Sequence, residues 1–330
     1  MKHIIHIIIG SFIFITSFGN LAYDFCPDLH NIDQTDLLTQ QRTGIKGYRD
    51  VVVYNNGFLA VGTDGRIDII AKSGEKKAVR SNSSDNLNCV INADQTLIAV
   101  GDKGTILISP DGNIFNKASS GTVRNINGIT LFNSILVAGA DGGTILISKN
   151  GTVWSIINLQ LKGNIVSVTA NKSSCFGVTD TGEIIKSSDG INWEITDFNR
   201  QYAGYYKPCS FRRALLTENR IVLIGKHTDG TPAVLFSTIG NVWTERMLNY
   251  TDDQGMPGML NNTPNDITYD PVDDQFFLAC DDGEILSLPS CTKCNVLSKV
   301  TGKDLNGIIN ADGLLLSVGE DFFVNILNLR

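Results

Sequence analysis

Basic residues are scarce in this sequence of 330 residues. It has 27 lysines and arginines against 34 aspartates and glutamates, which gives a net charge of −7 at pH 7. No run of lysine and arginine is longer than two residues. Because binding to a phosphate backbone needs a patch of basic side chains, this composition argues against a nucleic-acid partner. Prolines are also few, at 8, and 42% of the residues are hydrophobic, so the chain can bury a substantial core.

The residues of common catalytic sites are equally sparse. Of the four histidines, His3 and His6 belong to an apolar N-terminal segment, which leaves His30 and His227. We expect His227, in the long turn "GKHTDGTP", to be solvated. The chain has no G-x-S-x-G elbow, no glycine-rich phosphate loop and no D-x-D-x-D-G calcium loop. We therefore predict no catalytic residue, no metal site and no cofactor, although carboxylates paired only by the fold stay open.

Long apolar runs are missing except at the N-terminus, where Ile4 to Phe18 is almost wholly apolar after Lys2. This pattern predicts a signal peptide over residues 1–22, cleaved after Gly19 or Ala22. A membrane anchor is the alternative, but the run is shorter than the about 20 residues needed to span a bilayer. We expect an exported protein (periplasmic, cell-surface or secreted) that does not span the membrane after cleavage, with an N-terminal extension over residues 23–36.

Seven cysteines follow the predicted signal peptide, and export permits disulfides. Their odd number leaves at least one thiol without an intramolecular partner. Cys291 and Cys294 form the motif "CTKC". Metal binding by this motif would need a second such pair, and a redox function would need a helix start. We expect a local Cys291–Cys294 disulfide or free thiols.

The mature chain repeats itself. A short apolar run ending in Gly, Ala or Cys, a tight turn and a second apolar run recur as in "IAVGDKGTILIS" and "LVAGADGGTILIS". The interval is about 40 residues, the length of a four-stranded β-propeller blade, except for two longer intervals before Gly225 and Cys280. The anchor residues of the seven copies are Gly62, Gly101, Gly139, Gly177, Gly225, Cys280 and Gly319.

These copies predict an all-β, seven-bladed β-propeller over residues 37–330. β-branched residues on both sides of each turn favour buried strands, and Asp-Gly pairs suit hairpin turns. The last copy lacks a fourth strand, so we predict that the segment Leu37 to Ile45 closes the last blade and removes its exposed edge.

A second turn motif follows the second run of most copies. It reads "SPDGNIF", "SKNGTVW" and "SSDGINW", with a degenerate "STIGNVW". It resembles the Asp-box repeats of sialidase-like and photosystem II assembly-factor-like propellers, although it is one residue shorter. Because the motif repeats in successive blades, its polar residues are interpreted as structural turn residues and its aromatic residues as packing between blades. These residues are Ser109, Asp111, Phe115, Ser148, Asn150, Trp154, Ser187, Asp189 and Trp193.

The resemblance implies two functions. Sialidase-like propellers are glycoside hydrolases, but their F/Y-R-I-P start is absent, and "SFRRA" lacks the proline. Assembly-factor-like propellers imply a scaffold for another protein. We predict an exported, non-enzymatic, protein-binding or assembly module whose partner is another exported or envelope protein. A carbohydrate-binding or sialidase-like propeller with a glycan ligand is the alternative.

The two long intervals predict where binding takes place. The extra segments, residues 197–214 and 249–266, both follow a fourth strand in successive blades. They are rich in Tyr, Arg and Met, which are enriched at protein interfaces. An insertion that packs on its own blade, tied by a Cys175–Cys209 disulfide or by none, is the alternative. The candidate binding residues are Tyr202, Tyr205, Tyr206, Arg212, Arg213, Tyr250 and Met256.

Overall fold

The computed structural model describes residues 6–9, 12–15, 45–238, 240–251, 257–289 and 294–330, and the chain divides into the units Met1–Ile45 and Lys46–Arg330. In the first unit, β1 (His6–Ile9) pairs antiparallel with β2 (Phe12–Ile15). No helix among the described residues is both long enough and apolar enough to cross a bilayer.

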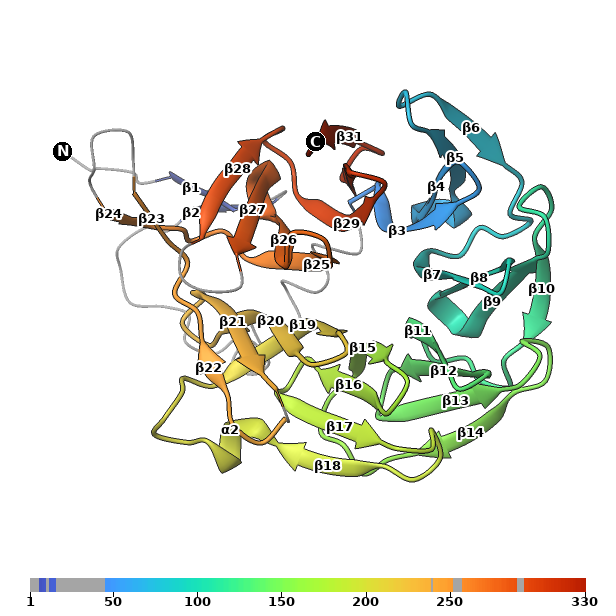
Figure 1. The fold of residues 1–330 in the computed structure, drawn as a ribbon, viewed down its shortest axis with the longest axis horizontal. Coiled ribbons are helices and arrows are strands. Elements are labelled where there is room, and N and C mark those ends of the chain that lie inside the picture. The colour runs from blue at the N-terminus through green and yellow to red at the C-terminus, as the bar shows by residue number, and fades with distance from the viewer. Residues whose placement is uncertain (1–5, 10–11, 16–44, 239, 252–256, 290–293) are drawn as a thin grey trace. The chain divides into compact units, whose positions relative to one another are not determined.

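The second unit is a seven-bladed β-propeller, as the repeat predicts (Figure 1). The first four blades are antiparallel sheets of four strands in chain order. Blade 1 contains β3 (Tyr48–Tyr54), β4 (Gly57–Gly62), β5 (Ile67–Ala71) and β6 (Lys76–Val79). Blade 2 contains β7 (Leu87–Ala93), β8 (Thr96–Gly101), β9 (Thr105–Ser109) and β10 (Asn116–Ser119). Blade 3 contains β11 (Ile126–Phe132), β12 (Ile135–Ala140), β13 (Thr144–Ser148) and β14 (Ser155–Asn158). Blade 4 contains β15 (Ile165–Ala170), β16 (Cys175–Thr179), β17 (Glu183–Ser187) and β18 (Glu194–Asp197).

The remaining blades carry the irregular features. Blade 5 contains β19 (Cys209–Leu216), β20 (Ile221–His227), β21 (Pro232–Ser237) and a short β22 (Thr244–Glu245). Blade 6 contains β25 (Pro264–Asp270), β26 (Gln275–Cys280), β27 (Glu284–Pro289) and β28 (Asn295–Lys299). Blade 7 contains β29 (Leu305–Ala311), β30 (Leu314–Gly319) and β31 (Val324–Asn328). The two inserted segments form the helix α2 (Phe198–Gln201) and the hairpin of β23 (Asn249–Thr251) with β24 (Pro257–Met259).

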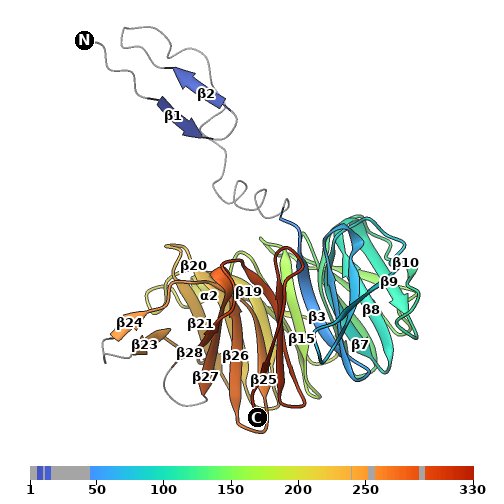
Figure 2. The same cartoon turned by 90° about the horizontal axis from the view of Figure 1, so that it is seen from above.

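The core lies between neighbouring blades. All six residues of β4 are buried, and the second strand of each other blade is nearly as buried, because both faces of a blade pack against other blades. Leu59, Leu97 and Phe115 belong to one such cluster between blades 1 and 2. In Figure 2 the strands run side by side between the two faces of the ring. Burial on both faces explains why these strands read as continuous apolar runs rather than as alternating patterns.

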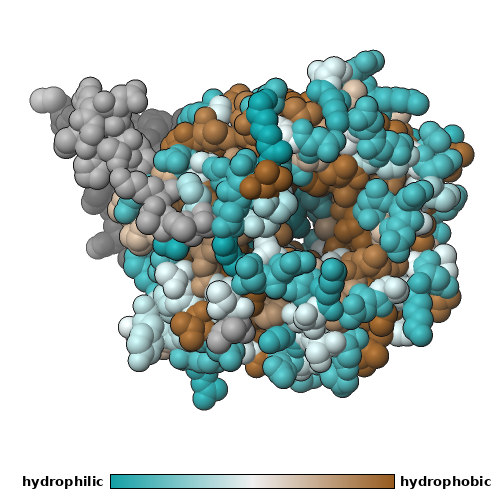
Figure 3. Space-filling view, in the orientation of Figure 1, coloured by the Kyte–Doolittle hydropathy of each residue, from teal (hydrophilic) through white to brown (hydrophobic). Residues whose placement is uncertain are grey.

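Each inner strand carries a β-bulge, at its second residue in six blades and at Arg212, the fourth residue of β19, in blade 5. The register with the second strand shifts there in all seven blades. A bulge opposes two residues to one and changes the direction in which side chains point. The residue at the bulge and the residue after it are therefore placed to bridge blades around the centre of the ring, where one face shows a hollow (Figure 3).

The two ends of the propeller meet between blades 7 and 1. The amide N–H of Asp321 donates to Lys46 O at 2.7 Å, and Gly47 forms a β-bridge with Glu320. The side-chain amide of Asn306 donates to Tyr48 O at 2.9 Å. Blade 7 has three strands among the described residues. The fourth strand predicted from Leu37 to Ile45 lies, except for Ile45, outside the described residues.

Candidate binding face

The bulge residues of the inner strands form a ring, polar except for Val166, on the face where those strands begin, which we call the start face. Asn88 shows the repeated arrangement: its side-chain amide donates to Asp102 Oδ1 at 2.9 Å and to Ile126 O of the next blade at 3.0 Å. Asn127 and Asn265 make the same pair of bonds in blades 3 and 6. Both amide hydrogens are therefore used, one within the blade and one to the next blade. The ring consists of Arg49, Asn88, Asn127, Val166, Arg212, Asn265 and Asn306.

Two arginines replace asparagine in this ring. Arg49 donates to the side-chain oxygen of Asn88 and lies 3.8 Å from Asp102 Oδ1. Its side chain is 25% exposed, and burial lowers its pKa, an effect that Asp102 offsets only in part. Arg212 lies 3.4 Å from Asp281 and is 17% exposed. A partly desolvated guanidinium gains from an anionic partner, so the start face favours carboxylate ligands at Arg49.

Arg213, the residue directly after the bulge of β19, is instead enclosed by acids. Its Nε donates to Asp266 Oδ1 at 2.6 Å, and its Nη2 donates to Asp50 Oδ1 at 3.1 Å. Burial lowers the pKa of Arg213, but Asp266 and Asp50 outweigh it and hold the pKa well above its usual value. The other oxygen of Asp50 accepts Val90 N–H, and that of Asp266 accepts Ile308 N–H, each at 2.9 Å. Arg213 thus links five blades, and its ion pairs with Asp266 and Asp50 are made within the propeller.

The insertion after blade 4 is packed rather than loose. Asp197 caps α2 by accepting the Arg200 N–H at 3.0 Å. Phe198, fully buried, contacts Tyr202 and Tyr206 with ring centroids 4.8 and 5.6 Å apart, and it also contacts Phe211 and Trp243. This aromatic cluster (Phe198, Tyr202, Tyr206, Phe211 and Trp243) fills the space between blades 4 and 5.

The three predicted tyrosines therefore have different surroundings. The hydroxyl of Tyr202 donates to Asn241 O at 2.7 Å, and that of Tyr206 donates to Trp243 O at 2.5 Å. Tyr205 is 84% exposed. Of the three, Tyr205 has an exposed ring, whereas Tyr202 and Tyr206 hold the insertion against blade 5.

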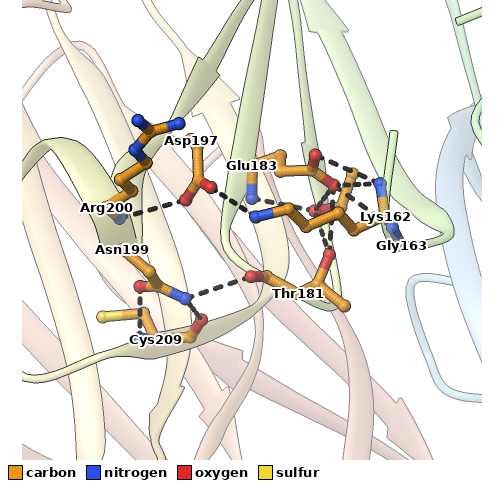
Figure 4. A network of polar contacts seen from close by, with 9 residues as sticks. Lys162, Gly163, Thr181, Glu183, Asp197, Asn199, Arg200 and Cys209 are labelled. Atoms are coloured by element: carbon orange, nitrogen blue, oxygen red, sulfur yellow. Dashed lines mark hydrogen bonds and ion pairs between the residues drawn. The ribbon is translucent and has the colours of Figure 1, made fainter. Parts of the chain in front are cut away.

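A buried polar network fixes the base of the insertion (Figure 4). Glu183, 3% exposed, accepts the backbone N–H groups of Lys162 and Gly163 at 2.9 and 3.1 Å. Asn199 accepts the Cys209 N–H at 2.8 Å and donates to the carbonyls of Thr181 and Cys209. Because a buried carboxylate needs such donors, this network holds α2 in one position relative to blades 4 and 5.

The structure describes the second insertion only in part, so it tests fewer of the binding residues predicted there. Tyr250 lies in β23, which pairs with β24, and the flanking Leu248 and Leu260 are buried between blades 5 and 6. Met256 lies outside the described residues. For Tyr250 the structure describes the backbone but not the side chain.

The structure corrects the expectation for His227. This residue is 3% exposed rather than solvated, because β20 continues through it and pairs it with Cys209. Cys89, Cys175, Cys209, Cys280 and Cys294 are buried free thiols, so the alternative Cys175–Cys209 disulfide is wrong. The predicted Cys291–Cys294 disulfide includes Cys291, which lies outside the described residues. Among the described side chains, no three from His, Cys, Asp and Glu are grouped to hold a metal ion.

The turns between third and fourth strands are closed by their polar residues. Ser109, Ser148 and Ser187 each accept the N–H of the glycine three residues later, at 2.8–2.9 Å. Asp111, Asn150 and Asp189 accept one or two further N–H groups within the turn. The aromatic residues that end the turns differ in burial: Phe115 is fully buried, whereas Trp154 and Trp193 are partly buried. Gly112 needs its positive φ of 70°, and a side chain there would collide with Tyr54 of blade 1.

Asp189 gives a testable pH dependence. The N–H groups of Asn192 and Ile191 hold its pKa below the usual range. A carboxylate with a depressed folded-state pKa stabilises the fold above its unfolded pKa of about 3.9, and this contribution is lost as the pH falls through the folded pKa. We expect Asp189→Ala to be less stable than the native chain at pH 7, and the difference to shrink below about pH 4. Urea unfolding at pH 7 and pH 3 measures this; a difference that does not change with pH would contradict it.

Comparisons with known proteins agree on the fold. No family model and no curated protein matches the chain. Among solved structures, YCF48 from Cyanidioschyzon merolae has a TM-score of 0.62 at 14% identity, over 84% of this chain and 94% of that one. YCF48 bound to D1 peptide has a TM-score of 0.64 at 15% identity, over 87% and 93%. The WD40 propeller of Doa1 has a TM-score of 0.65 at 12% identity, over 85% and 92%. At these identities the likeness is one of fold.

Proposed function

We propose that this propeller is a non-enzymatic module that binds a carboxylate-bearing segment of a partner protein on its start face. The observation that carries the proposal is Arg49, a partly buried cation whose nearest acid is 3.8 Å away. Arg212 adds a second cation to the same ring. The net charge of the chain is negative, so the positive charge of these arginines is confined to one part of the surface. It would attract an acidic group to that part rather than to the whole protein. A structurally similar propeller bound to a peptide supports the same mode of use.

Tyr205 gives this face a second anchor. The ring projects from an insertion whose base is fixed by Asn199 and Glu183, so little entropy is lost when a partner covers it. Exposed tyrosines on rigid supports are typical hot-spot residues. Sequence motifs of hydrolases are missing, which supports a role in binding or assembly rather than in catalysis.

The proposal is tested with peptide arrays of acidic and C-terminal segments. Each peptide is present as the free acid and as the amide, so that its charge is the only change. We expect binding of free acids, weakened about tenfold or more by Arg49→Gln, because a charge-assisted hydrogen bond contributes about 1.5–3 kcal/mol. Lys117→Gln is the matched control. It removes an exposed lysine of the outer strand β10 of blade 2, whose ammonium is paired with Asp85. Equal binding of acids and amides, or no effect of Arg49→Gln, would overturn the proposal.

We further propose that the protein acts outside the cytosol, on another exported or envelope protein. The apolar run from Ile4 to Phe18 supports export. Sequencing the N-terminus of the protein isolated from its native source tests this: a first residue at position 20 or 23 is expected, and an intact N-terminus on a cytosolic protein would contradict it.

A further inference from the structure

One end of blade 5 brings together a thiol, an imidazole and a backbone carbonyl. Cys209 is the first residue of β19 and His227 the last of β20, and the register pairs them directly. Paired residues of antiparallel strands place their side chains on the same face. Cys209 Sγ lies 3.4 Å from His227 Nδ1, and Lys207 O lies 3.3 Å from each of these two atoms. The three atoms form a nearly equilateral triangle.

This triangle has the dimensions of one face of a tetrahedral metal site. Zinc binds cysteine sulfur at about 2.3 Å, histidine nitrogen at about 2.0–2.1 Å and oxygen at about 2.0–2.2 Å, so tetrahedral ligands lie about 3.4–3.6 Å apart. We propose that Cys209 Sγ, His227 Nδ1 and Lys207 O bind a zinc-class metal ion, with water as the fourth ligand. Because one ligand is a backbone carbonyl, three metal-binding side chains are not needed.

The second nitrogen of the imidazole supports this assignment. His227 Nε2 lies 2.7 Å from Glu245 Oε1. A carboxylate can only accept here, so Nε2 donates to Glu245, and Nδ1 is the nitrogen that faces the thiol and the carbonyl and would bind the ion. A carboxylate that orients a histidine in this way is the usual outer partner of a metal-bound imidazole.

The ligands are also held in place and shielded. Cys209 and His227 are 2% and 3% exposed. The backbone of Cys209 is bonded on both sides by Asn199, and Thr228 N–H donates to Pro208 O at 3.0 Å, which fixes the strand ends relative to each other. The Lys207 ammonium is paired with Asp229 at 2.6 Å.

Without an ion, the single thiol proton can be donated to Lys207 O at 3.3 Å or to His227 Nδ1 at 3.4 Å. When the ion binds, the thiol releases this proton to solvent. The bound ion would join β19 and β20 to Lys207, which lies two residues after Tyr205 in the same insertion. Metal loading would then stabilise the insertion as well as blade 5.

The test uses the full chain with Cys291→Ser and Cys294→Ser, so that the CTKC motif cannot bind the probe. After chelator treatment the protein is titrated with Co²⁺, which gives sulfur-to-cobalt charge-transfer absorption when a thiolate binds, and then with Zn²⁺ as competitor. We expect this absorption in the parent and with Cys175→Ser, a buried thiol without an imidazole partner, but not with Cys209→Ser. Glu245→Gln should weaken the affinity by about 10–100-fold.

Thermal unfolding with and without Zn²⁺ provides an independent readout. Zn²⁺ should raise the Tm of the parent and of Cys175→Ser, and leave that of Cys209→Ser and His227→Gln unchanged. Charge-transfer absorption that persists in Cys209→Ser, or its absence from the folded parent, would overturn the proposal. If Cys209→Ser does not fold, Glu245→Gln decides alone, and an unchanged affinity there would also overturn it.

Discussion

Replacement of Arg213 by methionine is expected to lower the free energy of unfolding by about 3–5 kcal/mol. The side chain is 18% exposed, and its partners Asp50 and Asp266 are each 8% exposed. Removing the cation leaves two largely desolvated carboxylates side by side, without the charge that compensates them. Urea unfolding monitored by circular dichroism and by tryptophan fluorescence measures the loss.

Two further variants separate the ion pair from the packing of its hydrocarbon chain. Arg212→Met changes the same residue type one position earlier; that side chain is as buried as Arg213, but its partner Asp281 is 28% exposed and lies 3.4 Å away, so a smaller loss than for Arg213→Met is expected. The combination of Arg213→Met with Asp50→Asn and Asp266→Asn removes all three charges and keeps acceptors for Val90 and Ile308, so it should recover part of the loss. Equal losses for Arg212→Met and Arg213→Met would contradict this account.

The fold was predictable from the sequence because it is repeated. Each blade has the same order of apolar runs and turns. Where the pattern of one copy is ambiguous, the other six copies show where its strands and turns lie. The pairing of Arg213 was not predictable for the opposite reason: Asp266 and Asp50 are 53 and 163 residues away and belong to blades 6 and 1. The three residues hold the same position in their blades, directly after the bulge, but the repeat does not indicate that their side chains meet, and only closure of the ring brings them together.

The composition of the sequence predicted only part of what the structure shows about the candidate binding residues. Composition indicated an insertion rich in tyrosine but not which rings face inward. Phe198, Tyr202 and Tyr206 are four residues apart, and this spacing is the one signal that could have predicted a common packed face at the start of the insertion. His227 could not be placed, because a turn that contains Asp-Gly gives no information about how far the preceding strand extends.

The largest packing effect is expected at Phe198. Its fully buried ring contacts four other aromatic rings, so Phe198→Ala should cost about 3–5 kcal/mol by loss of buried area and by the cavity left behind. Tyr206→Phe keeps the ring and removes its hydrogen bond to Trp243 O, so about 1 kcal/mol is expected. Tyr205→Ala, at an exposed position, should stay within about 0.5 kcal/mol of the native chain.

These three variants also separate stability from binding. If the insertion presents Tyr205 to a partner, Tyr205→Ala should weaken peptide binding while leaving unfolding unchanged, and Tyr206→Phe should leave binding almost intact. Phe198→Ala should weaken binding only through loss of the folded insertion, so adding a stabilising condition such as sulfate should restore its binding but not that of Tyr205→Ala. A Phe198→Ala protein as stable as the native chain would show that the aromatic cluster does not hold the insertion. The fixed support proposed for Tyr205 would then be lost with it.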